Sequence, residues 1–293
     1  MEKFKRVYIE ISNICNLQCS FCPVVERDKK IMDVDLFKSI LTEVSPYTHE
    51  VCLHLMGEPL AHPDFLKILS IAEENYLQTQ VQINLTTNGI LLNKCKNELI
   101  HSKAIRQINF SIQSFQDNFK DRDITPYLMD ILEFSKESQK MRDDLYINFR
   151  LWNLKDAQTQ NESNLPLIKT IANFFSVEIN PAIDVGSIKS KKIINKIYFH
   201  FDSRFTWPSM NLPVINQSGF CHGLSGHIGI HADGTVVPCC LDKEAVINLG
   251  SLKNTTISDV LNSSRAKAIK NGFSQKKLVE EMCKRCPYIK RFQ

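Results

Sequence analysis

Six short runs of β-branched and aromatic residues alternate with amphipathic segments, and this alternation constrains the fold more than any other feature of the chain. Parallel strands need a crossover of a dozen or more residues, usually a helix, so such alternation is typical of parallel β/α units. We therefore expect an α/β fold, and a partial (β/α)6 barrel of parallel strands in preference to a doubly wound sheet. The expected strands are 7–12, 50–56, 80–86, 107–113, 145–152 and 177–180.

The intervening segments have the period of helices. Residues 33–44 place apolar side chains on one stripe, with Asp33 as the expected N-cap, and 64–75 and 127–140 are similar. Helices therefore fill the crossovers that the parallel strands require.

The chain divides by composition into three predicted parts. The barrel is expected over 1–186, a basic and polar linker over 187–219, and a small module over 220–293. Within that module, Asp233-Gly234 is a favourable turn for a hairpin. A helix is predicted at 257–272.

Composition excludes several classes of protein. The 293 residues carry 36 − 32 = +4 net charges, too few to suggest a nucleic-acid partner. No apolar run approaches the roughly 18 residues that a spanning helix needs, so no membrane role is expected. Charged residues interrupt the N-terminal segment where a secretory signal would be apolar, so we expect a cytoplasmic protein.

The ten cysteines lie mostly in two clusters. Without a secretory signal, clustered thiols indicate metal or redox chemistry rather than disulfides. Cys52 and Cys95 lie between the clusters and are interpreted as small buried apolar residues. The first cluster is Cys15, Cys19 and Cys22, and the second is Cys221, Cys239, Cys240, Cys283 and Cys286.

The first cluster is a Cys-x3-Cys-x2-Cys loop directly after the first strand. Three thiolates can hold three irons of a [4Fe–4S] cluster, which leaves the fourth iron open, and an open coordination position is what a catalytic metal keeps for substrate. Polar residues such as Asn16, Gln18 and Ser20 in the same loop argue against a buried core segment.

The string CNLQCSFC resembles the signature of the radical S-adenosylmethionine (radical SAM) superfamily. Three further motifs follow in the family's order: LHLMGEPL, similar to its Gly-Gly-Glu-Pro motif with Met56 in place of the first glycine, then LTTNG and FSIQS. Each lies near the C-terminal end of an expected strand, where β/α barrels bind ligands.

This resemblance implies a role for each matching residue. The first three cysteines would ligate the cluster, whose open iron binds the amino and carboxylate groups of SAM. Asn88 is expected either to line the pocket or to serve the turn before Gly89, and Arg150 either to bind the SAM carboxylate or to lie on the surface. The expected SAM contacts are Phe21 with the adenine, Gly57, Glu58 and Pro59 with the methionine amino group, Ser111 with the methionine or ribose, Asn88 and Arg150.

The reaction implied by the resemblance is reductive cleavage of SAM to a 5′-deoxyadenosyl radical, which abstracts hydrogen from a substrate. An electron donor such as flavodoxin or ferredoxin is therefore an expected partner. The sequence assigns no general acid or base.

The second cluster supplies four thiolates. On chemistry alone, Cys221, Cys239, Cys283 and Cys286 suit a structural zinc ion or a second [4Fe–4S] cluster equally. Their Cys-x12-Gly-x4-Cys and Cys-x2-Cys spacings resemble the auxiliary-cluster module called SPASM, or its shorter form, twitch, which favours the cluster. Nearby histidines leave a mixed Cys/His site as an alternative.

The substrate is not determined by the sequence. Peptide or protein modification and small-molecule oxidation, as in the similar aminocyclitol dehydrogenases, are both expected classes. The alternative function is a non-catalytic iron–sulfur or zinc protein that transfers electrons or binds a partner, which would not need Gly57, Glu58 or Ser111.

Overall fold

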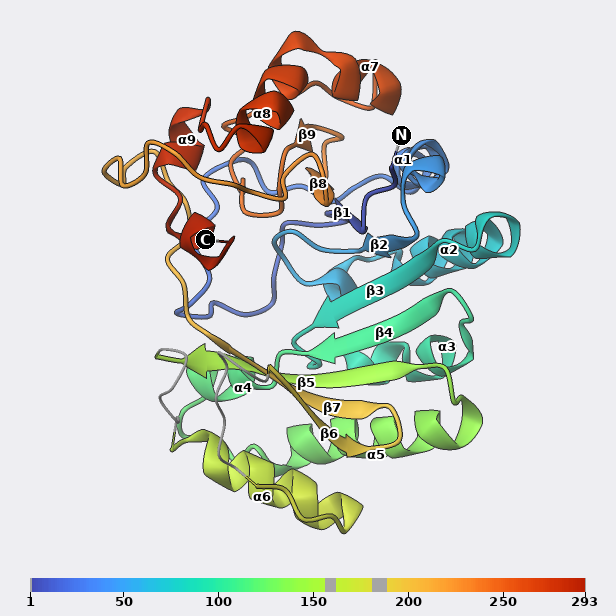
Figure 1. Cartoon of the computed structure of the whole chain (residues 1–293). Coiled ribbons are helices and arrows are strands. Elements are labelled where there is room, and N and C mark those ends of the chain that lie inside the picture. The colour runs from blue at the N-terminus through green and yellow to red at the C-terminus, as the bar shows by residue number, and fades with distance from the viewer. Residues whose placement is uncertain (1, 156–161, 181–188, 293) are drawn as a thin grey trace. The chain divides into compact units, whose positions relative to one another are not determined.

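The computed structural model describes residues 2–155, 162–180 and 189–292, which form two compact units. The first unit comprises Met1–Asn16, Pro23–Ile83 and Phe205–Gln293, and the second comprises Leu17–Cys22 and Asn84–Arg204. The chain enters each unit more than once, so residues distant in sequence become neighbours within a unit (Figure 1).

The first unit is built on four strands in the order β2-β1-β8-β9. The parallel pairings place Tyr8 opposite Cys52 and Ile9 opposite Ile230, so β2, β1 and β8 end at the same edge of the sheet. Strand β9 pairs with β8 in an antiparallel hairpin. The bounds are β1 (Arg6–Ile9), β2 (Glu50–Cys52), β8 (His227–Ile230) and β9 (Val236–Val237).

Helices of the first unit follow the local sequence signals. Asp33 caps the first helix as predicted, because its carboxylate accepts hydrogen bonds from Asp35 N at 2.9 Å and Leu36 N at 3.2 Å. The helix predicted at 257–272 is instead broken at Ser263, whose hydroxyl accepts from Ala266 N and caps a second segment. The helices are α1 (Val34–Val44), α2 (Phe65–Thr79), α7 (Ile257–Asn262), α8 (Ser264–Ser274) and α9 (Glu281–Lys284).

In its described residues, the second unit contains five strands in the order β6-β7-β5-β4-β3. Strands β4, β5 and β7 run parallel and β6 is antiparallel to β7, so the sheet is largely parallel and ends at an edge strand rather than closing into a barrel. The strands are β3 (Gln82–Thr87), which begins in the first unit, β4 (Ile105–Phe110), β5 (Tyr146–Leu154), β6 (Ser190–Ile194) and β7 (Ile197–Ser203).

One face of these strands packs against helices. Ile147, Phe149 and Leu151 of β5 are fully buried. The ring of Phe110 of β4 contacts that of Phe134 edge-to-face, with 5.8 Å between the ring centroids. This side forms the apolar core of the second unit, with α5 running alongside it (Figure 1). The helices are α3 (Lys96–His101), α4 (Gln113–Asn118), α5 (Thr125–Met141) and α6 (Asn164–Phe175).

The sixth strand was predicted at 177–180, and that prediction was wrong. Residues 177–180 are irregular, and β7 takes the place beside β5. The hairpin of β6 and β7 lies among residues expected to be linker. Two adjacent lysines, Lys191 and Lys192, hide the strand pattern of β6, and Asn195, with φ of +45°, makes the tight turn. The exact domain boundaries stay a prediction.

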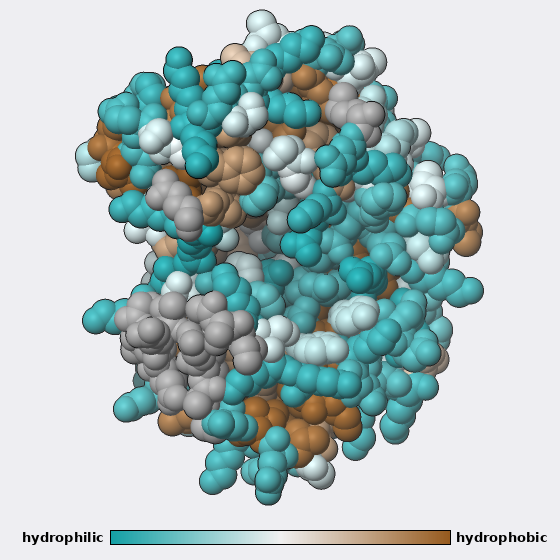
Figure 2. All heavy atoms as spheres, viewed as in Figure 1, coloured by the Kyte–Doolittle hydropathy of each residue, from teal (hydrophilic) through white to brown (hydrophobic). Residues whose placement is uncertain are grey.

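The surface matches the composition. Charged residues make up 23% of the chain, and hydrophilic side chains predominate on the face shown in Figure 2. Among the described residues, no helix combines the length and apolar character needed to cross a membrane.

Candidate active site

The two ends of the loop that carries the first cysteine cluster are hydrogen-bonded to each other in the first unit. Asn13, 9% exposed, donates from its backbone N–H to Lys30 O at 3.1 Å and accepts from Lys30 N at 2.7 Å. Its amide also donates to Asp28 O at 2.8 Å. One buried asparagine therefore joins the chain before the cysteines to the chain after them, a role that its polar character alone did not reveal.

Cys19 and Cys22 lie together in the second unit, against α4. Cys22 N donates to Cys19 O at 3.1 Å, and Asn118 donates from its amide to Cys19 Sγ at 3.2 Å. Ser20 binds Asp117 through both its N–H and its hydroxyl, at 2.5 and 2.6 Å. Sequence reasoning missed Asp117 and Asn118, although they follow the FSIQS motif closely. Cys15 is an exposed residue of the first unit.

These contacts favour the thiolate of Cys19. Hydrogen bonding by Cys22, and then by Ser114 and Asn118, lowers the pKa of Cys19 to about 7 against the opposing effect of burial. The thiolate is the form of cysteine that binds metals, so this segment fits an iron ligand. Phe21, the expected adenine contact, is half-buried between the two cysteines in sequence.

Gly57 lies in contact with the start of the cysteine loop. Its φ is +76°, and a Cβ at this position would lie 2.2 Å from Ser12 O and 2.9 Å from Ile14 O. Glu58 N donates to Ile14 O at 2.9 Å. No residue with a side chain fits here without moving backbone, so glycine is required for the motif turn to approach the cysteine loop.

Glu58 is 2% exposed and accepts from Leu60 N at 3.0 Å, capping the 3-10 turn Pro59–Ala61. Met56, in place of the family's glycine, is buried, and its backbone N–H donates to Glu10 Oε2 at 3.2 Å. Carboxylates therefore hold backbone N–H groups of the turn on both sides of Gly57, within the first unit.

The remaining expected SAM contacts lie in the second unit at strand ends. Asn88 is buried and accepts from Ile90 N at 3.0 Å, which is a turn role. Ser111 follows β4, and its N–H donates to Thr87 O at 2.9 Å, so these two strand ends adjoin. Arg150 lies on β5 opposite His200.

The register decides which face Arg150 occupies. It shares a face with Asn148, whereas Phe149 and Leu151 lie in the apolar core. Its guanidinium lies 4.4 Å from the ring centroid of Trp152, and Trp152 Nε1 donates to His200 Nδ1 at 2.8 Å.

The same face carries a buried row of amides that sequence reasoning missed. Asn109 donates to Asn84 Oδ1 at 2.7 Å and accepts from Asn148 Nδ2 at 2.9 Å, and all three side chains belong to residues at most 9% exposed. We call the side of β3, β4, β5 and β7 that carries these residues, Arg150 and Trp152 the polar face. Its sequence signal is that Asn84, Asn109 and Asn148 each stand between two apolar residues of a strand.

The second cysteine cluster assembles within the first unit. Burial first, and then Cys240, Cys221 and Cys283, raise the pKa of Cys239 well above its ordinary value. Burial, and then Cys221 and Cys286, raise the pKa of Cys283 in the same way. Burial raises the pKa of Cys286 to about 11, with a contribution from Cys221. Thiolates gathered here would repel one another, so the donor set fits a bound cationic metal centre.

Cys239 and its neighbour Cys240 differ in their surroundings. Cys239 interacts with both Cys221 and Cys283. Cys240 interacts with Cys221 and receives a hydrogen bond from Tyr8. Within the described residues, no three His, Cys, Asp or Glu side chains are placed to hold a single metal ion. Cys52 and Cys95, outside both clusters, are buried at 2% and 4% exposure, as predicted.

The chain is similar to known proteins over both regions. The pattern of the radical SAM superfamily matches residues 9–147, and that of the SPASM iron–sulfur cluster-binding domain matches residues 221–287. A probable GTP 3′,8-cyclase of Methanococcus vannielii is 25% identical over 288 residues, covering 90% of this chain and 93% of that protein.

Solved structures share the fold. BtrN in complex with AdoMet and 2-DOIA superposes with a TM-score of 0.61 at 16% identity, over 98% of this chain and 94% of BtrN. Streptococcus suis SuiB bound to precursor peptide SuiA superposes with a TM-score of 0.63 at 16% identity, over 100% of this chain and 73% of SuiB. Both family patterns imply iron–sulfur clusters, one of them a SAM-binding [4Fe–4S] cluster. The chain belongs to the radical SAM superfamily, carries a C-terminal SPASM domain, and is a radical SAM enzyme.

Proposed function

We propose that Cys15, Cys19 and Cys22 ligate the SAM-binding [4Fe–4S] cluster, and that Cys221, Cys239, Cys283 and Cys286 ligate an auxiliary one. When bound and reduced, the first cluster supplies the electron that cleaves SAM to methionine and the 5′-deoxyadenosyl radical, which abstracts hydrogen from the substrate. A small electron-carrier protein such as flavodoxin or ferredoxin delivers that electron.

The observation that carries this proposal is the approach of Gly57 to the cysteine loop. The backbone turn at 57–58 contacts Ser12 and Ile14, which lie three residues and one residue before Cys15. An electron-transfer or binding module has no use for such a turn beside its cluster loop. A SAM-binding enzyme needs it, because backbone groups there receive the amino group of the methionine moiety.

Other residues have supporting roles in the proposed SAM site. Phe21 contacts the adenine, Glu58 and Pro59 fix the turn, and Ser111 and Arg150 hold the remaining polar groups of SAM. Asn88 shapes the adjoining turn. A guanidinium suits a carboxylate because its N–H groups form a matching fork.

The substrate is proposed to be polar. The polar face presents buried amides and, at Arg150, Trp152 and His200, a cation with two aromatic rings. Hydroxyl and amide groups of a substrate would find hydrogen-bonding groups on such a face, whereas a lipid chain would offer them nothing to pair with. A peptide and a small polar molecule both meet this requirement, and the two similar structures divide in the same way, since SuiB is bound to a precursor peptide and BtrN to 2-DOIA.

The test is iron content and low-temperature EPR after anaerobic reconstitution. We expect about eight irons in the wild type and about four in a C15A/C19A/C22A variant, with no zinc. Cys95→Ala, which removes a buried thiol outside both clusters, is the matched control and should keep all the iron. SAM should alter the EPR signal of the reduced wild type and yield 5′-deoxyadenosine.

Each contrary result points to a specific alternative. A triple variant that keeps all its iron would show that the N-terminal loop is not the cluster site. A wild type that holds iron but neither binds nor cleaves SAM would favour the non-catalytic module. Deuterium transfer into 5′-deoxyadenosine from deuterated peptide or from deuterated polyol candidates separates the two substrate classes.

A further inference from the structure

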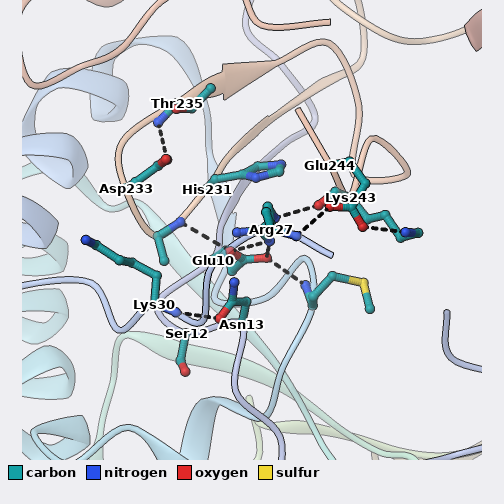
Figure 3. A network of polar contacts seen from close by, with 12 residues as sticks. Glu10, Ser12, Asn13, Arg27, Lys30, His231, Asp233, Thr235, Lys243 and Glu244 are labelled. Carbon is teal, nitrogen blue, oxygen red and sulfur yellow. Dashed lines mark hydrogen bonds and ion pairs between the residues drawn. The ribbon is translucent and has the colours of Figure 1, made fainter. Parts of the chain in front are cut away.

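A fully buried carboxylate lies at the centre of a polar network in the first unit (Figure 3). Glu10, which follows β1, is 0% exposed and receives Arg27 Nη2 at 2.7 Å on Oε1 and 2.5 Å on Oε2. Met56 N donates to Oε2 and Ala232 N to Oε1, each at 3.2 Å. Both carboxylate oxygens are therefore occupied, which is how a buried charge is tolerated.

Strand order explains why these groups meet. Strand β1 lies between β2 and β8, and all three run parallel, so the chain leaving each strand emerges at the same edge. Glu10 is the first residue beyond β1, Met56 lies beyond β2, and Ala232 lies beyond β8. A carboxylate at this central position reaches the backbone on both sides.

Arg27 connects the same carboxylate to the loop after Cys239. Its Nε donates to Lys243 O at 2.6 Å, and its backbone N–H donates to Glu244 Oε2 at 3.0 Å (Figure 3). Lys243 Nζ in turn donates to Val24 O at 2.7 Å. The segment that follows the first cysteine cluster is thereby fastened to the segment that follows Cys239 and Cys240.

We propose that Glu10 and Arg27 are positioning residues for SAM, which hold the Met56–Gly57 turn in register with the loop that follows the auxiliary cysteines. The inference rests on the proposed function of that turn. It also explains the departure at Met56: the position contributes its backbone N–H to Glu10, and every residue except proline can do so.

The central variant is Glu10→Gln. The amide has one acceptor oxygen in place of two, so either Met56 N–H or Ala232 N–H faces an NH₂ group, and the charge that holds Arg27 is lost. Removing a charge-assisted hydrogen bond at a buried site is expected to raise the Kd for SAM about tenfold or more. Iron content should match the wild type.

Two further variants separate positioning from general stability. E10Q/R27M removes both buried charges, so its thermal midpoint should recover toward the wild type while its Kd for SAM stays raised. Glu50→Gln breaks the Arg6–Glu50 pair, 2.5 Å long and located at β1 and β2, as a matched control. It should lower stability and leave the Kd for SAM unchanged.

The experiment is titration of SAM into anaerobically reconstituted protein, followed by the EPR change of the reduced cluster, with thermal unfolding measured in parallel. An E10Q protein with the wild-type Kd overturns the inference, as does a Kd that rises equally in E50Q. If E10Q is insoluble, R27K decides: it keeps the charge but loses the Nε–H that reaches Lys243, and an unchanged Kd overturns the inference. A wild type that binds no SAM refutes the proposed function itself.

Discussion

Gly57→Ala is the most direct test of the SAM-binding turn. The new Cβ would lie 2.2 Å from Ser12 O, about 1 Å inside the closest normal contact, and both partners are backbone. The φ of +76° adds about 1–2 kcal/mol for any residue with a side chain. The turn must therefore shift by about 1 Å, and a displacement of that size at a reaction site lowers rates by about 100-fold.

The assay is 5′-deoxyadenosine formation with excess reductant, together with the Kd for SAM. We expect kcat/KM for SAM to fall about 100-fold in G57A, with iron content unchanged. Gly234→Ala is the matched control: its φ is +87°, but the nearest atoms to its Cβ would be Ser251 Oγ at 3.3 Å and Lys253 Cγ at 3.4 Å, both on side chains that can move. G234A should share the conformational penalty and keep SAM affinity. A G57A enzyme with normal kcat/KM would refute the reasoning.

Three further predictions follow from the described contacts. Asn118→Leu removes the hydrogen-bond donor to Cys19 Sγ, so the reduction potential of the SAM-binding cluster should fall in an EPR-monitored redox titration. The reduction potential of the auxiliary cluster should not change. Met56→Gly should leave the Kd for SAM within about threefold and lower the free energy of unfolding by about 3–5 kcal/mol, because it removes a buried side chain and adds backbone freedom; titration and denaturant unfolding measure the two. Burial lowers the pKa of His227 to about 4 from an unfolded value of about 6.5. The contribution of this group to the free energy of unfolding is therefore complete above pH 6.5 and is lost as pH falls toward 4. Between pH 7.5 and 5.5 the free energy of unfolding should decrease by about 1.3 kcal/mol through this group, and His227→Gln should remove that part of the slope in denaturant titrations.

Local signals predicted much of this protein. The helix cap at Asp33, the hairpin turn at Asp233-Gly234 and the cysteine spacings each depend on residues close together in the chain. Likewise, φ of +76° at Gly57 is a preference of one residue type, so the motif turn could be located from sequence. Such features follow from the conformational and chemical properties of short segments, which the sequence states directly.

Contacts between distant segments required the tertiary structure. The face occupied by Arg150 depends on its register with His200, and the strand at 197–203 is recognised only when β5 provides its partner. The hydrogen bond from Asn118 to Cys19 spans 99 positions, and that from Ala232 to Glu10 spans 222. The sequence by itself determined which residues can bind a cluster and where the chain can turn. Only the tertiary structure decided which backbone groups surround Glu10, because strand order, and not proximity in the chain, brings the ends of β2, β1 and β8 together.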